Sequence, residues 1–348
     1  MKIIITTVQI PFVQGGAEFL ANNLKNALIE AGHEAEIVTM PFMDNPPELL
    51  ENHIVASRLL NVENSWGGHH DLCIALKFPA YYMPHPNKVV WALHQHRAAF
   101  DLFDTEYSSI KNNEEGRKIR DMVRNADQKY LGEAKRIYTI AKNVSNRMMK
   151  YTNIDSTPLY HPCPDMEKFY NLEYGEYILM PSRINITKRQ MLALEALKLT
   201  KKDVKLCIVG KAENDIEKNK ILNFIRKNRL EKRVTYMDFV SQEKKLELYA
   251  KAKAVLFIPK DEDYGYITLE AMAASKMIIT MKDSGGPLEF VDDEKDGVIS
   301  ENSAEELARH LDEVWSSHSM AEEYGQAAKK KLIDMDITWS NVVKELTK

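Results

Sequence analysis

The 348-residue chain has few cysteines, and their spacing is uninformative for cross-linking. Its three cysteines are Cys73, Cys163 and Cys207, which lie far apart and form no C-x-x-C motif. An odd number of widely spaced cysteines argues against a disulfide scaffold and against a structural zinc site, and it is typical of a reducing compartment. We therefore expect a cytoplasmic protein.

The chain also lacks a basic excess and long apolar runs. Its 47 basic and 51 acidic residues give a net charge of −4, whereas duplex-DNA binders usually carry a basic excess because phosphate contacts supply most of their affinity. No apolar run approaches the ~18 residues needed to cross a bilayer. The apolar start, residues 1–8, lacks a small-residue cleavage site and is predicted to be a buried strand, not a signal peptide.

What the chain does have is the composition of a soluble globular protein. Hydrophobic residues make up 44% and charged residues 28%, which is enough apolar surface for a sizeable core and excludes a disordered chain. With 14 glycines and 13 prolines it is not collagen-like. At roughly 100–200 residues per domain, the length predicts about two domains.

Strand and helix patterns alternate along both halves, which predicts parallel sheets with helices on their faces. In the first half we expect strands at 3–8, 35–39, 72–76, 88–93 and 136–140, and helices at 17–31, 48–60, 114–131 and 143–149. In the second half we expect strands at 177–180, 204–209, 234–237, 254–258 and 277–280, and helices at 189–199, 215–227, 242–250, 268–274, 304–315, 320–332 and 338–346.

A proline-rich stretch separates the two series. Residues 155–165 contain three prolines and little periodicity, so we interpret them as a linker. The expected organisation is an α/β protein with a first domain at 1–165, a second at 166–332 and a terminal helix at 333–348. Two doubly wound, Rossmann-like domains facing a cleft would bind ligands beyond the carboxyl ends of their strands.

The segment 257–273 carries the strongest chemical pattern. A strand ends, an acidic loop follows, and a helix begins after Gly265. Free amides at that helix start favour an anion or sugar hydroxyls. Glu262 and Glu270, with seven residues between them, are able to accept paired hydrogen bonds from vicinal hydroxyls, which sugars and riboses supply. The alternative is an acidic first turn on a surface helix.

This arrangement, with Tyr264 and Tyr266 inside it and Ala-Met-Ala at 271–273 after it, closely resembles the signature of GT-B glycosyltransferases, most of all the retaining family 4 group. The resemblance implies that Glu262 orients the sugar of a nucleotide-sugar donor. It implies that Glu270 binds the nucleotide ribose and that amides near Gly265 hold the diphosphate.

Other segments lie where the resemblance expects them. Arg183 and Lys188 follow the first strand of the second domain. In the family an Arg and a Lys at this place bind the donor diphosphate. The planar guanidinium of an arginine and the compact charge of a lysine both suit phosphate oxygens. The family has glycine after this Lys, whereas here Arg189 follows. A solvated basic helix start is the alternative for Lys188 and Arg189.

The first domain matches more loosely. Gly15 and Gly16 resemble the family's Gly-Gly-x-Glu loop, which lets backbone approach the donor phosphate or the acceptor; a plain tight turn is the alternative, and no G-x-G-x-x-G nicotinamide fingerprint is present. The family often places a histidine after the strand that ends near residue 93, and His94 is our candidate. His96 is the alternative, and strand alternation would put both on one face.

Four further segments resemble the second half of the family pattern. Gly210 ends a strand in the nucleotide half, and Phe239 lies in the segment whose backbone meets the base, although the family commonly has glycine at Asp238 or Phe239. The Gly-Gly-x-x-Glu loop at 283–291 lies near the donor. The terminal helix with Trp339 resembles the element that packs back on the first domain.

The resemblance implies a metal-independent enzyme without a cofactor. It would move a sugar from a UDP- or GDP-sugar to a hydroxyl acceptor in glycan or glycoconjugate biosynthesis. The anomeric configuration would be retained, by a front-side reaction in which the departing phosphate takes the acceptor proton. Neither a metal nor nucleic acid is expected as a partner.

Two alternatives stand beside this interpretation. The first is a nucleotide-sugar epimerase of the same architecture, and the second is a cytoplasmic sugar-nucleotide-binding protein without activity. A separate side hypothesis concerns the segment 111–136, whose mixed charges are typical of a solvated helix face: it could make peripheral contact with a lipid-borne acceptor.

Overall fold

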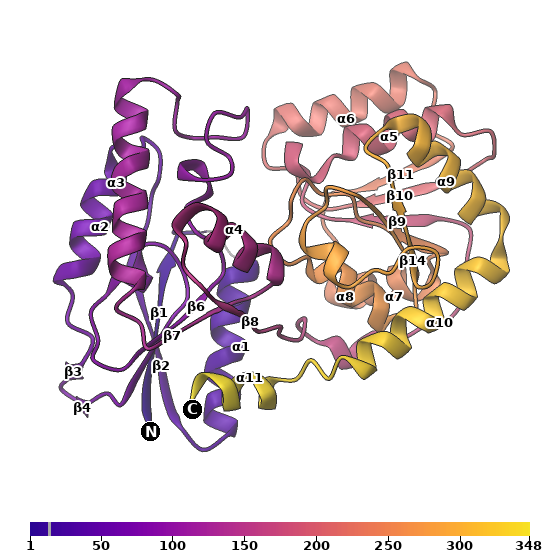
Figure 1. The fold of residues 1–348 in the computed structure, drawn as a ribbon. Coiled ribbons are helices and arrows are strands. Elements are labelled where there is room, and N and C mark those ends of the chain that lie inside the picture. The colour runs from indigo at the N-terminus through magenta and orange to yellow at the C-terminus, as the bar shows by residue number, and fades with distance from the viewer. Residues whose placement is uncertain (13–14) are drawn as a thin grey trace. The chain divides into compact units, whose positions relative to one another are not determined.

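The computed structural model describes residues 1–12 and 15–348, and it divides the chain into two compact units. Unit 1 comprises Met1–Pro164 and Thr338–Lys348, and unit 2 comprises Asp165–Ile337. Within the described residues, each unit contains a parallel sheet of six strands flanked by helices (Figure 1). The expected α/β class with two Rossmann-like sheets is confirmed.

The sheet of unit 1 has the strand order β2-β1-β5-β6-β7-β8. Its strands are β1 (Lys2–Gln9), β2 (Glu34–Pro41), β5 (Leu72–Ala75), β6 (Lys88–Ala92), β7 (Arg136–Thr139) and β8 (Thr157–Pro158). The helices of this unit are α1 (Gly16–Glu30), α2 (Leu49–Leu59), α3 (Glu114–Leu131), α4 (Lys142–Thr152) and α11 (Trp339–Leu346).

Burial explains why the central strands of unit 1 lack alternation. Every residue of β5 and β6 is buried, as is typical of parallel strands covered on both faces. Trp91 is fully buried in β6 and donates its indole N–H to the carbonyl of Leu159 at 3.2 Å. Its ring meets Trp339 of α11 edge-on at 6.3 Å, so the terminal helix packs into unit 1.

Two short elements of unit 1 differ from the sequence expectation. The proline-rich stretch does not run free over its whole length, because β8 pairs with β7 through Thr157 and Pro158. A small hairpin of β3 (Asn64–Ser65) and β4 (Gly68–His69) precedes β5. Both elements have strands of two residues, which leave no periodic pattern in the sequence.

The sheet of unit 2 has the strand order β11-β10-β9-β12-β13-β14. Its strands are β9 (Ile178–Pro181), β10 (Leu206–Val209), β11 (Val234–Met237), β12 (Ala254–Leu256), β13 (Ile278–Met281) and β14 (Gly297–Ser300). The helices are α5 (Gln190–Leu199), α6 (Asp215–Lys227), α7 (Gln242–Lys251), α8 (Tyr266–Ala273), α9 (Ala304–Ser316) and α10 (His318–Asp334). The sequence patterns did not indicate β14, whose residues Gly-Val-Ile-Ser contain only two strong strand formers.

In both sheets the chain adds strands first on one side of the first strand and then on the other side. In unit 2 the chain runs from β9 outward through β10 and β11, and then crosses to the other side of β9 to form β12. In unit 1 the same reversal separates β1 from β5. Open α/β sheets bind ligands at such a switch point, beyond the carboxyl ends of the two strands. The loops after β9 and β12 are therefore the first place to look for a site.

None of the helices in the described part of the chain is both long and apolar enough to span a membrane.

Candidate functional site

The loops after β9 and β12 meet in unit 2. The loop after β9 leads into the short 3-10 helix η4 (Ile186–Lys188), and the loop after β12 carries Glu262. The ammonium of Lys188 forms an ion pair with the carboxylate of Glu262. A backbone hydrogen bond from the amide of Lys260 to the carbonyl of Thr187, 2.7 Å, joins the same two loops. The switch point thus brings together the two predicted site residues Lys188 and Glu262.

The backbone of Glu262 is also tied to the loop after β13. Its amide donates to the carbonyl of Ser284 at 2.8 Å, and its carbonyl accepts from the amide of Gly286 at 2.7 Å. A Cβ on Gly286 would lie 2.5 Å from the carbonyl oxygen of Tyr264, so only glycine fits this close approach. The predicted Gly-Gly loop at 283–291 therefore acts as a support that holds the Glu262 backbone.

Arg189 shows how this chain accommodates its departure from glycine. Its φ is +57°, the left-handed region that glycine adopts readily and other residues rarely. The guanidinium donates two hydrogen bonds to the carboxylate of Asp283, one of 2.7 Å, and Lys260 donates a third at 2.8 Å. Burial by itself raises the pKa of Asp283, but the hydrogen bonds from Arg189 and Lys260 outweigh burial and hold the pKa below its usual value.

Glu270 lies on α8 and is only 6% exposed. One carboxylate oxygen accepts a hydrogen bond from Lys245 at 2.5 Å, and the other accepts from the hydroxyl of Tyr249 at 2.6 Å. Sequence reasoning missed both partners. Lys245 and Tyr249 are four residues apart on the predicted helix 242–250, so the sequence placed them on one face of that helix. No sequence pattern indicated that this face contacts Glu270.

The start of α8 depends on glycine. Gly265 has a φ of +92°, and a Cβ there would approach the ring of Phe257 to 3.0 Å. The ring of Tyr264 is buried and meets Phe290 edge-on at 5.4 Å, which gives it a packing role. Tyr266, at the first position of α8, is half-buried and contacts Tyr264 at 5.7 Å. A ligand role for the two tyrosines stays a prediction.

Arg183 and Phe239 are exposed on loops beyond the carboxyl ends of β9 and β11. Arg183 belongs to the exposed residues, and within the described part of the chain its guanidinium forms no hydrogen bond or ion pair. Phe239 is 85% exposed. Its neighbour Asp238 pairs with Lys218 and accepts from the hydroxyl of Tyr236 at 3.1 Å. An exposed aromatic ring beside an anchored backbone suits stacking against a planar group.

Gly210 lies where β10 passes close to the loop after β9. Its φ is +155°, and a Cβ would lie 1.9 Å from the carbonyl oxygen of Ser182. The structure therefore accounts for this glycine by packing between two loops of the candidate site. Direct contact of Gly210 with a ligand stays a prediction.

The glycine turn of unit 1 opens α1. Gly15 is the N-cap residue with an extended φ of −161°, and its amide donates to the side chain of Glu18 at 2.7 Å. A Cβ on Gly15 would meet only ordinary contacts among the described residues, so the described fold does not itself demand glycine there. Gly16 is the exposed first residue of α1. Val13 and Gln14 of this loop lie outside the described residues.

The two candidate histidines of unit 1 differ in their surroundings. His94 is half-buried, and its Nδ1 donates to the carbonyl of Gln95 at 2.6 Å. His96 is buried between aromatic rings, 5.0 Å from Phe78, and its Nε2 has no partner among the described residues. Burial lowers the pKa of His96 to about 4, so the ring is neutral. The expectation that both lie on one face depended on strand alternation, which does not reach them because β6 ends at Ala92.

A buried polar network next to these histidines was not anticipated. Asp127 of α3 is fully buried and accepts hydrogen bonds from Tyr81 at 2.9 Å, Tyr82 at 2.5 Å and Gln95 at 2.7 Å. Burial raises the pKa of Asp127 to about 6, with the three hydrogen bonds acting in the opposite direction. Because Gln95 lies between the two histidines, this network anchors the segment that carries them.

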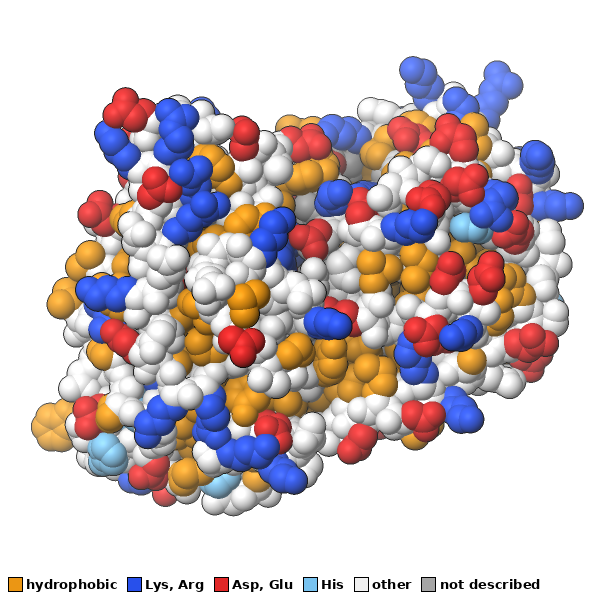
Figure 2. Space-filling view, viewed as in Figure 1, with side chains coloured by type: hydrophobic (Ala, Val, Ile, Leu, Met, Phe, Trp, Pro, Cys, Tyr) orange, Lys and Arg blue, Asp and Glu red, His pale blue; other side chains and the backbone are white. Residues whose placement is uncertain are grey.

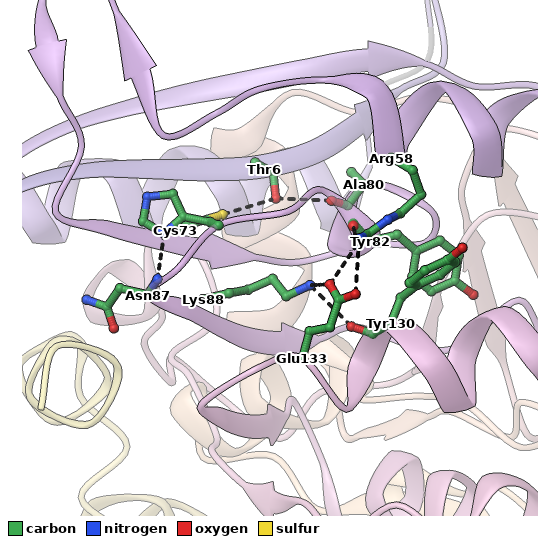
Figure 3. Close-up of polar contacts among 10 residues, drawn as sticks. Thr6, Arg58, Cys73, Ala80, Tyr82, Asn87, Lys88, Tyr130 and Glu133 are labelled. Carbon is green, nitrogen blue, oxygen red and sulfur yellow. Dashed lines mark hydrogen bonds and ion pairs between the residues drawn. The ribbon is translucent and has the colours of Figure 1, made fainter.

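A second polar cluster of unit 1 lies at the amino end of β6. Lys88, at the amino end of β6, is fully buried and contacts Glu133 at 3.4 Å. Glu133 also binds Arg58 through two hydrogen bonds of 2.7 and 3.0 Å, and Arg58 lies over the ring of Tyr130 (Figure 3). The single carboxylate of Glu133 pairs with both cations between α2 and the end of α3, and burial lowers the pKa of Lys88. We therefore assign the cluster a structural role.

Charges of both signs alternate along α3, the helix of the segment 111–136. Lys118 pairs with Glu114 at 2.7 Å and Arg120 with Asp121 at 2.8 Å, and acidic and basic side chains lie mixed over this helix at the upper left of Figure 2. In the described chain, no group of three or more His, Cys, Asp or Glu residues is arranged to hold a metal ion.

Residues 165–331 match the family model described as "Glycosyl transferases group 1". Among curated proteins, the human alpha-1,3/1,6-mannosyltransferase ALG2 is 26% identical over 168 residues, which are 44% of this chain and 40% of that protein. The poly(ribitol-phosphate) alpha-N-acetylglucosaminyltransferase of Staphylococcus aureus (strain COL) is 29% identical over 170 residues, 47% of this chain and 33% of that protein. The matched segments thus span less than half the length of these relatives.

Solved structures resemble the whole chain. Sucrose-phosphate synthase from Thermosynechococcus elongatus superposes with a TM-score of 0.78 at 15% identity, covering 100% of this chain and 98% of that one. HepE from Anabaena, in complex with UDP and glucose, has a TM-score of 0.72 at 14% identity, with coverage of 100% and 98%. The chain therefore has the GT-B fold, and its residues 165–331 are similar to the glycosyl transferases group 1 family.

Proposed function

We propose that the protein is a retaining glycosyltransferase that moves a sugar from a nucleotide-sugar donor to a hydroxyl acceptor. The observation that carries this proposal is the meeting of Lys188 and Glu262 at the switch point of unit 2. A cation and a carboxylate at that place are complementary to the two ends of the reacting bond, a leaving phosphate and a polyhydroxylated sugar. The glycosyl transferases group 1 model, which residues 165–331 match, supports the same reaction class.

The proposed diphosphate site consists of Arg183, Lys188 and the first amides of α8 after Gly265. In the structure Lys188 pairs with Glu262, and in the proposed complex a phosphate oxygen takes the place of that carboxylate. Arg183 is exposed and brings a planar fork that suits phosphate. Negative charge grows on the leaving diphosphate as the glycosidic bond breaks, so fixed cations lower the barrier. Such cations make a metal ion unnecessary in this proposal.

Glu262 and Glu270 take the hydroxyl groups of the donor. Release from Lys188 leaves the Glu262 carboxylate to accept hydrogen bonds from sugar hydroxyls, while its backbone stays fixed by Ser284 and Gly286. Glu270 is held by Lys245 and Tyr249. Each carboxylate oxygen accepts more than one hydrogen bond, so Glu270 is able to accept ribose hydroxyls without losing these partners. Phe239 offers its exposed ring to the base.

Unit 1 supplies the acceptor side of the proposal. Gly15 and Gly16 give the acceptor or the donor phosphate close access to backbone, and the described fold requires no glycine at position 15. His94, whose ring is half-buried, is the proposed catalytic histidine of this unit. No side chain is assigned as a nucleophile; the departing phosphate takes the acceptor proton in a front-side transfer that retains configuration. We place the protein in the cytoplasm, where nucleotide sugars are its partners.

UDP is the first nucleotide to test, because solved structures of HepE contain UDP, UDP with glucose, or UDP-glucose. The experiment is a thermal-shift titration of the full chain with UDP, GDP, ADP and their sugar conjugates, since a ligand that binds the native state raises the melting temperature. We expect one nucleotide series to shift the wild type. Arg183→Ala and Glu270→Ala should weaken that shift, whereas the exposed controls Arg226→Ala and Glu323→Ala should keep it.

Product analysis then separates the alternatives. Transfer to an added hydroxyl acceptor supports the proposal, and the anomeric configuration of the product tests retention. An altered sugar nucleotide formed without an acceptor would indicate an epimerase instead. Binding without turnover over a broad acceptor panel would indicate a binding protein, and no shift with any nucleotide in well-folded protein would overturn the proposal.

A further inference from the structure

Unit 1 contains a cavity, lined by both polar and apolar side chains, that no part of the donor site uses. It has a volume of about 360 Å³ and lies between α1, the last residues of β1 and the middle of β2. Because β2 is the edge strand of its sheet, this groove opens at the sheet border. Small-molecule sites usually measure about 300–1,000 Å³, so the groove is large enough for a ligand of a few hundred daltons.

The polar side chains of the groove are already oriented. The Glu18 carboxylate accepts from the amide of Gly15 at 2.7 Å, and the Asn22 amide donates to the carbonyl of Glu18 at 2.9 Å. Lys25 and Glu36 form an ion pair of 2.7 Å across the groove. Each bond uses one oxygen of a carboxylate, and the second oxygen of Glu18 and of Glu36 has no hydrogen-bond partner in the described chain. Groups held in this way lose little entropy on binding.

The lining indicates the chemistry of the ligand. Two carboxylates and one ammonium give the groove a net negative charge, which disfavours phosphate, sulfate or a uronic acid. Thr7 and Thr39 add hydroxyl groups at the carboxyl ends of β1 and β2. Closely spaced carboxylates, an amide and hydroxyls match vicinal hydroxyl groups, which both donate and accept. Val8, Ala21 and Ile37 supply apolar surface for the C–H face of a ring.

We propose that this groove is a binding subsite for a neutral pyranose unit of a saccharide. Glu18 lies three residues after Gly15, so the groove begins next to the glycine turn. A saccharide whose reacting end is at that turn would place a neighbouring sugar in the groove. The assignment of this saccharide to the acceptor rests on the proposed function, whereas binding of the pyranose itself does not.

The test measures binding to full-length protein without any nucleotide. Saturation-transfer NMR titrations use methyl α-D-mannopyranoside and methyl α-D-glucopyranoside as neutral probes, and D-glucuronate and D-glucose 6-phosphate as anionic ones. We expect saturable binding of at least one neutral probe and at least three-fold weaker binding of both anionic probes. Absence of saturable binding by both neutral probes, or tighter binding of the anions, would overturn the proposal.

Variants locate the binding in the groove. Thr7→Val removes one hydroxyl at constant shape, and Glu36→Gln changes an exposed side chain that the fold does not need. We expect at least five-fold weaker pyranoside binding in each. Glu34→Gln, an exposed carboxylate at the start of the same strand and outside the groove, is the matched control. Equal binding by wild type and both groove variants would refute the location, and Glu36→Gln keeps the test valid if Thr7→Val folds poorly.

The same samples distinguish failure of this inference from failure of the proposed function. UDP binding in unit 2 with no pyranoside binding would remove the groove and leave the transferase proposal intact. Pyranoside binding that depends on Thr7 and Glu36, with no nucleotide binding, would keep the subsite and remove the transferase.

Discussion

Asp283 holds the guanidinium of Arg189 through two hydrogen bonds, beside a backbone conformation that arginine rarely adopts. A left-handed φ costs a residue with a Cβ about 1–2 kcal/mol. The two side chains are only 15% and 21% exposed, so their ion pair is screened little by water. The pair therefore offsets the backbone strain and joins the loop after β9 to the loop after β13.

We predict that Asp283→Asn lowers the free energy of unfolding by about 1–3 kcal/mol, because Arg189 and Lys260 lose a charged acceptor. Arg189→Gly should cost less, since it relieves the strained φ while it removes the ion pair. The wild type should also lose stability as pH falls through the lowered native pKa of Asp283, and the Asn variant should lack this contribution. Urea denaturation across pH measures these effects. Asp334→Asn, an exposed control, should match the wild type.

The two hydrogen bonds on Glu270 predict an indirect effect on nucleotide binding. Lys245→Met removes the partner that orients one carboxylate oxygen, so we expect nucleotide affinity to fall about three- to ten-fold, which corresponds to roughly 0.7–1.4 kcal/mol. Lys251→Met lies on the same helix but pairs with Glu247, and it should leave the affinity unchanged. Isothermal titration calorimetry, with the nucleotide that raises the melting temperature of the wild type, measures both affinities. Equal losses in the two variants would mean that general charge, not the orientation of Glu270, is responsible.

Asp127 predicts a pH dependence of stability with an unusual sign. Its native pKa of about 6 lies above the usual 3.8, so between these values the folded state holds a proton that the unfolded state has released. Stability from this group is therefore present at low pH and falls as pH rises from about 4 to 6, by roughly 3 kcal/mol. The unfolding free energy of wild type relative to Asp127→Asn should change by this amount across the window and stay constant above it.

The control for this measurement is Asp121→Asn on the same helix, where the carboxylate is 57% exposed. Its pH profile should follow that of the wild type. A constant offset between wild type and Asp127→Asn over the whole range would contradict the raised pKa.

Two glycines provide a matched test of close packing at the site. A Cβ at Gly210 would lie 1.9 Å from the carbonyl oxygen of Ser182, so Gly210→Ala should destabilise unit 2 by about 3 kcal/mol or more. At Gly67 the nearest atom, the Ser65 hydroxyl oxygen, would be 3.4 Å away, and Gly67→Ala should stay within about 0.5 kcal/mol of wild type. Differential scanning calorimetry compares the two. A folded Gly210→Ala with wild-type stability would show that the two loops separate freely.

Much of the fold was predictable because its signals are local. The buried strands 254–258 and 277–280 appear in the structure as β12 and β13 within one or two residues, since short apolar runs bounded by turns indicate them directly. The two-residue strands β3, β4 and β8 were missed because they are too short for a pattern. The environments of His94 and His96 were also beyond prediction, because they depend on where β6 ends and on which aromatic rings pack around it.

The sequence by itself determined the alternation of strands and helices, the parallel α/β class and the spacing of Glu262 and Glu270, because periodicity and residue order are properties of neighbouring residues. Only the tertiary structure decided which groups meet. The crossing of β12 to the far side of β9 brings Lys188 to Glu262 across 74 positions of the chain. The packing of α7 against α8 gives Glu270 its partners Lys245 and Tyr249. Such pairings depend on long-range packing of whole elements, which no local pattern in the sequence encodes.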